Sequence, residues 1–305
     1  MIFDMGSGIL RAVGDSKSPL RYLVFCCVLN IGLDLLFVAV FGWEVAGVAW
    51  ATVISLALSS VLVVMKLART KEAYAFHLSM LRFHAPQLRH MLHIGIPAGI
   101  ESAMYAVSNI LIQAAVNDLG TSMVAAWTLT SKLDGIYWAV SNSFGVAIMA
   151  FVGQNFGAGK YDRMKKSVRV CLAIAMGFTV VMSALLLLLG RYGFRIFVSD
   201  GAVINLAVQI MSYFVPYYFV WTFIEVLSNS LRGAGDAINP MIIAIVGVCG
   251  LRILWMMFVV PVWNNIQGIS YCYPVTWAIT ALAFVVYYRK SNWLDRCVTR
   301  AGEGR

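Results

Sequence analysis

Long apolar stretches recur along the whole chain, and they constrain its fold more than any other feature. A helix needs ~20 apolar residues to cross a bilayer. The sequence predicts eight such transmembrane helices, at about residues 20–41, 46–68, 93–117, 123–153, 168–190, 204–231, 239–261 and 267–289. Hydrophobic residues make up 61% of the chain and charged residues only 12%, about half the usual share of a soluble domain. We therefore expect an all-α, multi-pass membrane protein with about eight transmembrane helices.

Basic residues are distributed unevenly among the connectors of these spans. Most of the 23 lie before the first span, in 66–93, in 154–169, after residue 231 or in the tail. The opposite set of connectors holds only Arg191 and Arg195. Because Lys and Arg concentrate in cytoplasmic loops, we expect the C-terminus to be cytoplasmic in a cell (inner or plasma) membrane. This pattern accounts for the net charge of +9, so nucleic acid is not an expected partner.

One motif occurs twice, 221 positions apart. Residues 10–19 and 231–240 both read Leu-Arg-x-x-Gly-Asp-x-x-x-Pro, and farther along Gly47 matches Gly268 at the same offset. Both copies lie between two spans and on the same predicted side of the membrane. The chain is therefore predicted to contain two parallel repeats, related by an axis along the membrane normal, as in many transporters.

The motif has the features of a helix end followed by a helix start. Its arginine meets the negative end of a helix dipole, and its glycine permits a left-handed exit. We interpret Ser18-Pro19 and Asn239-Pro240 as N-caps followed by proline at the first helical position. The turn is thus a positioning element, or alternatively a gate. The residues concerned are Arg11, Gly14, Asp15, Arg232, Gly235 and Asp236.

The two copies have very different lengths of chain in front of them. If the repeat is complete, roughly 130 residues of the first half precede Met1. We expect 1–68 to be the end of an N-terminal bundle, 69–92 a cytoplasmic linker, 93–290 a six-helix bundle and 291–305 a cytoplasmic tail. The chain would then be the last two-thirds of a twelve-helix, two-bundle protein. The linker histidines and the six cysteines have no metal-binding spacing, so no metal site is expected.

Four segments resemble the multidrug and toxic compound extrusion (MATE) family of secondary transporters. They are LRAVGDSKSPLRYL, GVAWATVIS, VGQNFGAGKYDRMKKS and LRGAGD. The resemblance is strongest at the two Gly-Asp turns and in the segment from Gly153 to Lys160, which starts with Gly153, Gln154 and Asn155. The resemblance implies two six-helix bundles around a central cleft, and export of a small organic molecule in exchange for Na+ or H+ as the bundles rock. It implies no enzymatic activity and no cofactor besides the coupling ion.

The segment from Gly153 to Lys160 also invites comparison with a nucleotide-binding loop. A P-loop needs four residues between its glycines, and Ser or Thr after its lysine. Here five residues separate Gly153 from Gly159, and Tyr161 follows Lys160. We therefore interpret this segment as a helix end with glycine exits, and expect an ion gradient rather than ATP to supply the energy.

Polar residues inside the spans are the candidate binding residues, because a charge in the bilayer is costly and usually faces a cavity. One helix presents Glu101, Tyr105 and Asn109 at intervals of four residues. Another presents Glu225 with Tyr217 and Trp221, a combination suited to an organic cation. Lys132 and Asp134, two residues apart, point in different directions, and Glu101 is a candidate partner of Lys132. Alternatively, the charged residues among them have a structural role and form ion pairs between packed helices.

The family resemblance implies that acids in the seventh and tenth spans couple the ion, and Glu101 and Glu225 lie in those spans. The hypothesis is that this pair alternately holds an ion and a cationic substrate in a monomeric transporter embedded in the lipid bilayer. Two alternatives remain open. One is a flippase for a lipid-linked precursor, which would want a cationic cavity, and the other is an inactive transporter fragment. No metalloprotease or nucleophile motif indicates a membrane enzyme.

Overall fold

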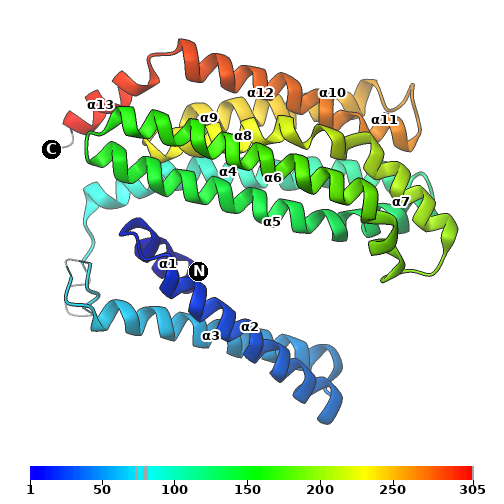
Figure 1. Ribbon diagram of the computed structural model, residues 1–305, viewed down its shortest axis with the longest axis horizontal. Coiled ribbons are helices and arrows are strands. Elements are labelled where there is room, and N and C mark those ends of the chain that lie inside the picture. Colours follow the sequence, from blue (N-terminus) through cyan, green and yellow to red (C-terminus); the bar gives the residue numbers. More distant parts are fainter. Residues whose placement is uncertain (73, 78–81, 304–305) are drawn as a thin grey trace. The chain divides into compact units, whose positions relative to one another are not determined.

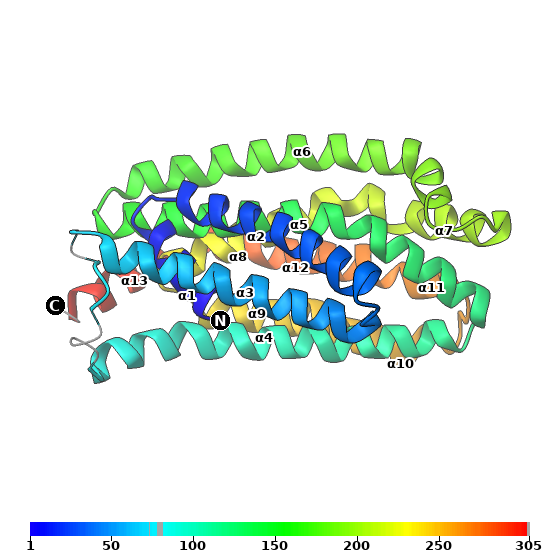
Figure 2. The ribbon, with the colours of Figure 1, turned by 90° about the horizontal axis from the view of Figure 1, so that it is seen from below.

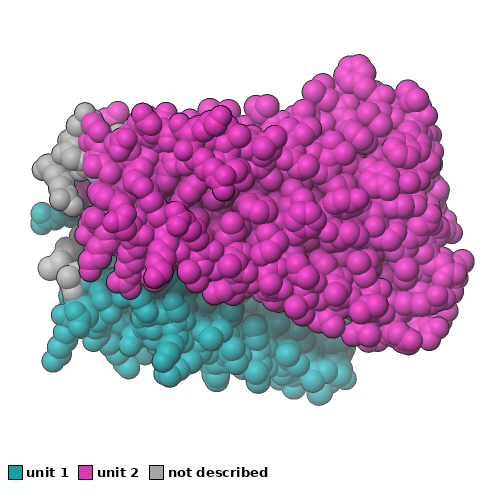
Figure 3. Space-filling view, turned by 45° about the horizontal axis from the view of Figure 1, so that its top comes forward, with its two compact units in different colours: residues 1–85 teal, residues 86–305 magenta. Residues whose placement is uncertain are grey.

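The computed structural model describes residues 1–72, 74–77 and 82–303. Within those residues all regular secondary structure is helical, which confirms the all-α fold class. The contacts divide the chain into two compact units, residues 1–85 and 86–305, which Figure 3 colours separately. Their boundary falls inside the 69–92 segment, although the last part of that segment, from Ala85, is already helical.

The first unit is a hairpin of two long helices with a short helix packed on it. α1 (Ile2–Ala12) leads through the first Gly-Asp turn into α2 (Lys17–Leu35), which continues as the π-helical turn η1 (Leu36–Val40). α3 (Glu44–Arg69) runs back beside α2 and also contacts α1 (Figures 1 and 2). The small buried core of this unit consists of Leu10, Val63 and Leu67.

The second unit is a helical bundle in which α5 (Thr121–Gly157) and α8 (Tyr218–Gly233) are central (Figure 2). α5 packs against α6, α7 and α8, and α8 also packs against α6 and α12. The remaining elements are α4 (Ala85–Asn117), α6 (Tyr161–Arg195), α7 (Gly201–Phe214), η3 (Val215–Tyr217), α9 (Ile238–Ala244), η4 (Ile245–Gly250), α10 (Leu251–Phe258), α11 (Ile266–Ser270), α12 (Cys272–Lys290) and α13 (Trp293–Glu303).

In the described part of the chain, seven helical segments are long and apolar enough to cross a membrane. They are 17–40, 44–69, 121–157, 161–195, 201–233, 238–258 and 266–290, and each contains or closely matches a predicted span. The remaining predicted span, 93–117, lies within the 33-residue α4. This helix carries Glu101, Ser108 and Asn109, which lower its hydropathy, and it is not one of the seven.

Glycines bring the two central helices of the second unit unusually close together. A Cβ atom on Gly233 of α8 would overlap the backbone of Met149 on α5. A Cβ on Gly153 of α5 would lie 3.2 Å from the Gly233 carbonyl oxygen, and one on Gly145 would overlap the Glu225 carboxylate. The spacing between α5 and α8 is therefore set by backbone contact, which holds the side chains of both helices in fixed register.

Pro216 interrupts the span formed by α7 and α8. Residues Val215–Tyr217 form a single 3-10 turn, η3, where the proline cannot donate a backbone hydrogen bond. The 3-10 turn at Pro216 therefore separates α7 from α8, which begins at Tyr218.

The two Gly-Asp turns adopt the same backbone conformation, but their helices start earlier than predicted. Gly14 and Gly235 both have a φ of 92°, in the left-handed region. The following helices begin at Lys17 and Ile238, so the prediction that Ser18 and Asn239 are N-caps is wrong. In both turns the aspartate three residues earlier binds this position instead. Asp15 accepts from the backbone amide of Ser18, whereas Asp236 accepts from the side-chain amide of Asn239.

Candidate functional site

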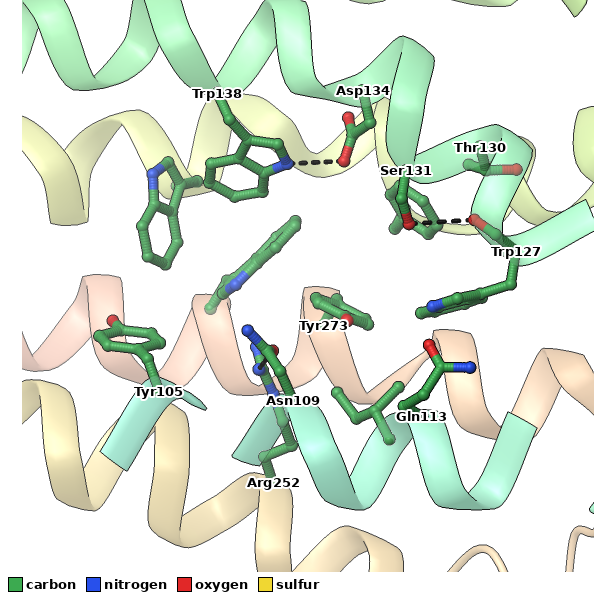
Figure 4. A pocket seen from close by; sticks show the side chains of 14 residues that line it. Tyr105, Asn109, Gln113, Trp127, Thr130, Ser131, Asp134, Trp138, Arg252 and Tyr273 are labelled. Atoms are coloured by element: carbon green, nitrogen blue, oxygen red, sulfur yellow. Dashed lines mark hydrogen bonds between the residues drawn. The ribbon is translucent and has the colours of Figure 1, made fainter. Parts of the chain in front are cut away.

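A cavity of about 540 Å³ lies among the helices of the second unit (Figure 4). Its size is within the range typical of small-molecule sites. Four of its lining residues are among those predicted from the sequence: Tyr105, Asn109, Asp134 and Trp221. The others are Ile112, Gln113, Trp127, Thr130, Ser131, Trp138, Phe214, Arg252, Tyr273 and Trp277.

One wall of the cavity is a stripe along α5. Trp127, Thr130, Asp134 and Trp138 follow one another at intervals of three or four residues, so they share a helix face. The Asp134 carboxylate accepts hydrogen bonds from the Trp138 indole, at 2.6 Å, and from the Tyr218 hydroxyl. This carboxylate is thus stabilised by hydrogen bonds, and no basic side chain of the described residues lies within 4.0 Å of it.

Half of the residues that line the cavity are aromatic. Trp138 contacts Trp221 edge to face, with ring centroids 5.1 Å apart, and Trp277 contacts both of them. Tyr273 packs against Trp277 at 5.4 Å, and Trp127 packs against Tyr273 at 6.2 Å. Such interlocked rings have few conformations available, so the cavity presents a preformed apolar surface to a flat ligand.

The opposite wall carries the only base of the lining, Arg252 of α10. Its guanidinium donates a hydrogen bond to the Asn109 side-chain carbonyl at 3.1 Å and lies 4.5 Å from the centre of the Tyr273 ring. Figure 4 shows Arg252 and Asp134 on opposite sides of the cavity, with Tyr273 between them. The lining therefore contains one acid and one base that do not neutralise each other.

A polar face of α8 runs from the cavity to the second Gly-Asp turn. It contains Tyr218, Trp221, Glu225, Asn229 and Arg232, spaced by three or four residues. Tyr218 donates a hydrogen bond to Asp134, and Trp221 lines the cavity. The Glu225 carboxylate accepts a hydrogen bond from Asn229 at 3.0 Å. No basic group of the described residues lies within 4.0 Å of this carboxylate.

Glu101 is paired with Arg232, not with Lys132. The Arg232 guanidinium donates to the Glu101 carboxylate across α8 and α4, and only 8% of Glu101 is exposed. The expected Glu101–Lys132 pair is therefore wrong, because the helices are rotated so that α4 faces α8 at this level. Lys132 is exposed on another face of α5. Glu101 and Glu225 both lie outside the cavity lining.

Sequence reasoning also placed Tyr217 at the site, but its ring is 39% exposed and does not line the cavity. The 3-10 turn at Val215–Tyr217 rotates this residue away, and its neighbour Tyr218 points inward instead. The aromatic residues that were missed, Trp127, Tyr273 and Trp277, had a usable signal. Trp127 continues the stripe of Asp134, and Tyr273 and Trp277 are four residues apart.

The turn residues connect the end of this face to other helices. Asp236 is 3% exposed and accepts hydrogen bonds from Asn239 at 2.8 Å and from the Tyr287 hydroxyl of α12 at 2.6 Å. In the first unit Asp15 accepts from the Ser18 hydroxyl at 2.6 Å. The Ser18 hydrogen bonds, with a smaller contribution from Lys66, hold the pKa of Asp15 below its usual 3.8.

The segment from Gly153 to Lys160 is the end of α5 and the turn into α6. The amide of Lys160 donates to the Asn155 carbonyl at 2.8 Å, and that of Ala158 donates to the Gln154 carbonyl at 3.1 Å. Gly159 has a φ of 68°, so it is the left-handed glycine of this helix end. The segment follows a helix rather than a strand, as the sequence predicts.

The family model for MatE matches residues 97–257, more than half of the chain, and this match covers the polar face of α8 and all of the cavity lining except Tyr273 and Trp277. The chain belongs to the MatE family. It is thus a multi-pass membrane protein of a transporter family, which agrees with its apolar helices.

Named relatives are similar to this chain over much of its length. Probable multidrug resistance protein YoeA of Bacillus subtilis is 25% identical over 300 residues, covering 95% of this chain and 64% of the relative. The FAD transporter of Shewanella oneidensis is 30% identical over 190 residues, covering 60% and 40%. Human multidrug and toxin extrusion protein 1 is 32% identical over 191 residues, covering 59% and 32%.

Solved structures share the fold. One is the outward-facing conformation of a multidrug resistance MATE family transporter, with a TM-score of 0.86, 17% identity, and coverage of 97% of this chain and 66% of that one. Another is the crystal structure of MATE in complex with MaL6, with a TM-score of 0.85, 18% identity, and coverage of 98% and 66%. The chain thus spans about two-thirds of the length of these MATE-fold proteins.

Proposed function

We propose that this protein exports small aromatic organic compounds across the cell membrane in exchange for Na+ or H+. The observation that carries the proposal is the polar face of α8. It joins the wall of an aromatic cavity, through Tyr218 and Trp221, to Glu225, a half-buried carboxylate with no ion-pair partner among the described residues. A ligand site and an ion site on one rigid helix are the two parts that coupled transport needs.

The cavity supplies the ligand site. Four tryptophans and two tyrosines of its lining offer flat apolar surfaces, which suit a planar ring system. The Asp134 carboxylate offers a negative charge to a cationic group on that ligand. Relatives named as multidrug resistance proteins support a small organic substrate.

Glu225 supplies the ion site. A carboxylate that is removed from water and has no basic partner binds a proton or a metal cation more readily than a paired one. The Asn229 amide donates a hydrogen bond to one oxygen of this carboxylate, and the absence of a side chain on Gly145 leaves room for the carboxylate between α5 and α8. Glu101 takes a different role, because it is already neutralised by Arg232.

Alternating access then follows from the position of α8. An ion bound at Glu225 changes the charge one turn from Trp221 and two turns from Tyr218, which holds Asp134. Ion occupancy and ligand occupancy therefore oppose each other along one helix. The Arg232–Glu101 pair and the second Gly-Asp turn hold the other end of α8, on the side that the distribution of basic residues predicts to be cytoplasmic.

A flippase for a lipid-linked precursor is less well supported. Binding a pyrophosphate would favour several basic residues in the cavity. The lining contains one base, Arg252, together with one acid, Asp134, and most of the remaining side chains are apolar or aromatic.

Transport into liposomes tests this function. The purified chain is reconstituted, and uptake of the fluorescent aromatic cation ethidium is followed after imposing a pH or Na+ gradient. We expect a gradient-driven flux that Glu225→Gln abolishes. Glu101→Gln should alter it through the Arg232 pair. The matched control Glu44→Gln, at the exposed start of α3, should leave it unchanged.

Two results would contradict the proposal. One is a flux that does not depend on either gradient. The other is a gradient-driven flux that neither Glu225→Gln nor Glu101→Gln changes, which would place the ion site on another residue.

A further inference from the structure

Arg252 is an unusual residue to find in the wall of an aromatic cavity. Only 3% of it is exposed, and it lies on a helix that spans the membrane. Its one hydrogen-bond acceptor among the described residues is the Asn109 side chain, at 3.1 Å, and its Nε is buried without a partner. No carboxylate in the described part of the chain lies within 4.0 Å of its guanidinium.

Burying such a charge without a counter-ion is costly. A guanidinium has five N–H donors, and in the described part of the chain one of them has a hydrogen-bond acceptor. A buried, unpaired ion costs several kcal/mol, roughly 2.5 to 3.5 for a basic residue on insertion scales. The Tyr273 ring, 4.5 Å away, offsets part of this cost and orients the guanidinium plane, but it does not neutralise the charge.

The acid of the cavity does not provide the missing partner. Asp134 receives hydrogen bonds from Trp138 and from Tyr218, both on its own side. Figure 4 shows that Arg252 reaches the cavity from the other side, next to Asn109, with the Tyr273 ring in between. Because Arg252 lines the cavity, an anionic group of a ligand held in the cavity can approach its guanidinium.

We propose that Arg252 binds the carboxylate of an aromatic ligand whose rings lie among the tryptophans of the cavity. The free donors of the guanidinium match a carboxylate in a two-point hydrogen-bonded pair. The anion enters a low-dielectric site, where this pairing is strong and selective. Together with Asp134, this subsite makes the cavity suited to aromatic compounds that carry an acid, including those that also carry an amine.

The proposal extends the proposed function by naming a substrate class, and it rests on that function only for transport. Binding is independent of it. A ligand can therefore bind at Arg252 even if no ion gradient drives its movement, and transport can occur with ligands that do not use Arg252.

Equilibrium binding to the chain in lipid nanodiscs tests the proposal, using three probes with the same ring system. They are 2-naphthoate (anionic), 2-naphthamide (neutral) and 2-naphthylmethylammonium (cationic). We expect wild-type protein to bind the naphthoate at least about tenfold more tightly than the naphthamide, because only the naphthoate forms the charged pair.

Substitutions at position 252 test whether Arg252 causes the preference for naphthoate over naphthamide. Arg252→Gln should remove the naphthoate preference while leaving naphthamide affinity within about twofold, since the aromatic walls remain. Arg252→Lys should keep part of the preference, because lysine retains the charge but not the two-point geometry. Arg191→Gln, at an exposed site outside the cavity, should change nothing.

Several results would overturn the proposal. They are equal binding of naphthoate and naphthamide by the wild type, an equal loss of both in Arg252→Gln, or no binding of any probe. If Arg252→Gln does not fold, the wild-type ratio and Arg252→Lys decide, and a Lys variant that keeps the full preference would argue against two-point binding. A failed transport assay with this preference intact would overturn only the proposed function.

Discussion

The two Gly-Asp turns have the same backbone but different surroundings. In both, the aspartate amide donates to the leucine carbonyl five residues earlier, at 2.9 Å for Asp15 and 3.0 Å for Asp236. Asp236 is buried and bonded to Tyr287 of α12, whereas Asp15 is half-buried and, among the described residues, has hydrogen bonds from its near neighbour Ser18, with Lys66 close to it. Tyr287 and Lys66 occupy the same place in the two repeats, 221 positions apart.

This difference separates the interactions that form within the motif from those that the motif makes with other helices. Glycine, aspartate and proline fix the turn in either context, because their effects act within a few residues. The second copy is connected to the rest of its bundle through Arg232 to Glu101 and through Asp236 to Tyr287. It therefore acts as the anchor of α8, and the same substitutions should have larger effects in the second turn than in the first.

The largest contrast is expected between Arg232→Gln and Arg11→Gln. Arg232→Gln leaves the buried Glu101 without a partner, which we expect to cost about 3 to 5 kcal/mol in the free energy of unfolding. Arg11 is only half-buried, and we expect Arg11→Gln to cost about 1 kcal/mol or less. Denaturation in mixed micelles measures both. Equal losses would contradict the anchoring role of the second turn.

A smaller contrast is expected between Asp236→Ala and Asp15→Ala. The first change leaves the half-buried Tyr287 hydroxyl without its acceptor and removes the Asn239 bond at a buried position, for a loss of about 2 kcal/mol. The second removes a half-exposed cap, for about 1 kcal/mol. Tyr287→Phe removes the hydrogen bond between the turn and α12 while leaving Asp236 in place. It should reproduce much of the Asp236→Ala loss, and a neutral Tyr287→Phe would place that loss in the turn itself.

The glycines should behave alike, because their role is local. A Cβ on Gly14 or on Gly235 would meet no neighbour within 4 Å, so Gly→Ala tests the backbone alone. Both have a φ of 92°, and we expect each substitution to cost about 1 to 2 kcal/mol. The two melting temperatures should fall by similar amounts. A much larger fall for Gly235→Ala would mean that this glycine also has a packing role.

The smallest effect concerns pH at the first turn. The pKa of Asp15 is lowered, so its carboxylate stabilises the turn fully above pH 3.8, and this stabilisation is lost as pH falls through the lower folded value. Amide hydrogen exchange of residues 15–20 should therefore lose protection between about pH 4 and pH 2, after correction for intrinsic rates. Asp15→Asn should remove the dependence, and a wild-type turn without it would contradict the Ser18 contact.

Much of the fold could be predicted because its determinants are local. The lengths of the apolar runs located the spans to within a few residues in most cases, and the glycines of the repeated motif located the two Gly-Asp turns. The predictions failed where helices rotate against each other. Glu101 and Arg232 are 131 positions apart, and nothing within one helix determines that they meet.

The same division holds for the candidate site. Charged and polar residues inside the spans pointed to Asp134, Asn109 and Tyr105, because such residues need a polar or aqueous environment. The free-energy cost of burying a polar side chain does not determine which of two neighbouring residues on a helix faces the cavity. The 3-10 turn decides that Tyr218 points inward rather than Tyr217, and the register of α5 decides that Lys132 points away from Asp134.

Ligand and ion oppose each other through α8 in the proposed cycle, and one binding measurement tests this directly. The neutral probe 2-naphthamide does not need the Asp134 carboxylate, so its affinity for the chain in nanodiscs reports on α8. As Na+ rises or pH falls, we expect its Kd to increase by about fivefold or more. In Glu225→Gln the Kd should not change with either ion. The same ion dependence in wild type and Glu225→Gln, or no dependence in the wild type, would contradict coupling at Glu225.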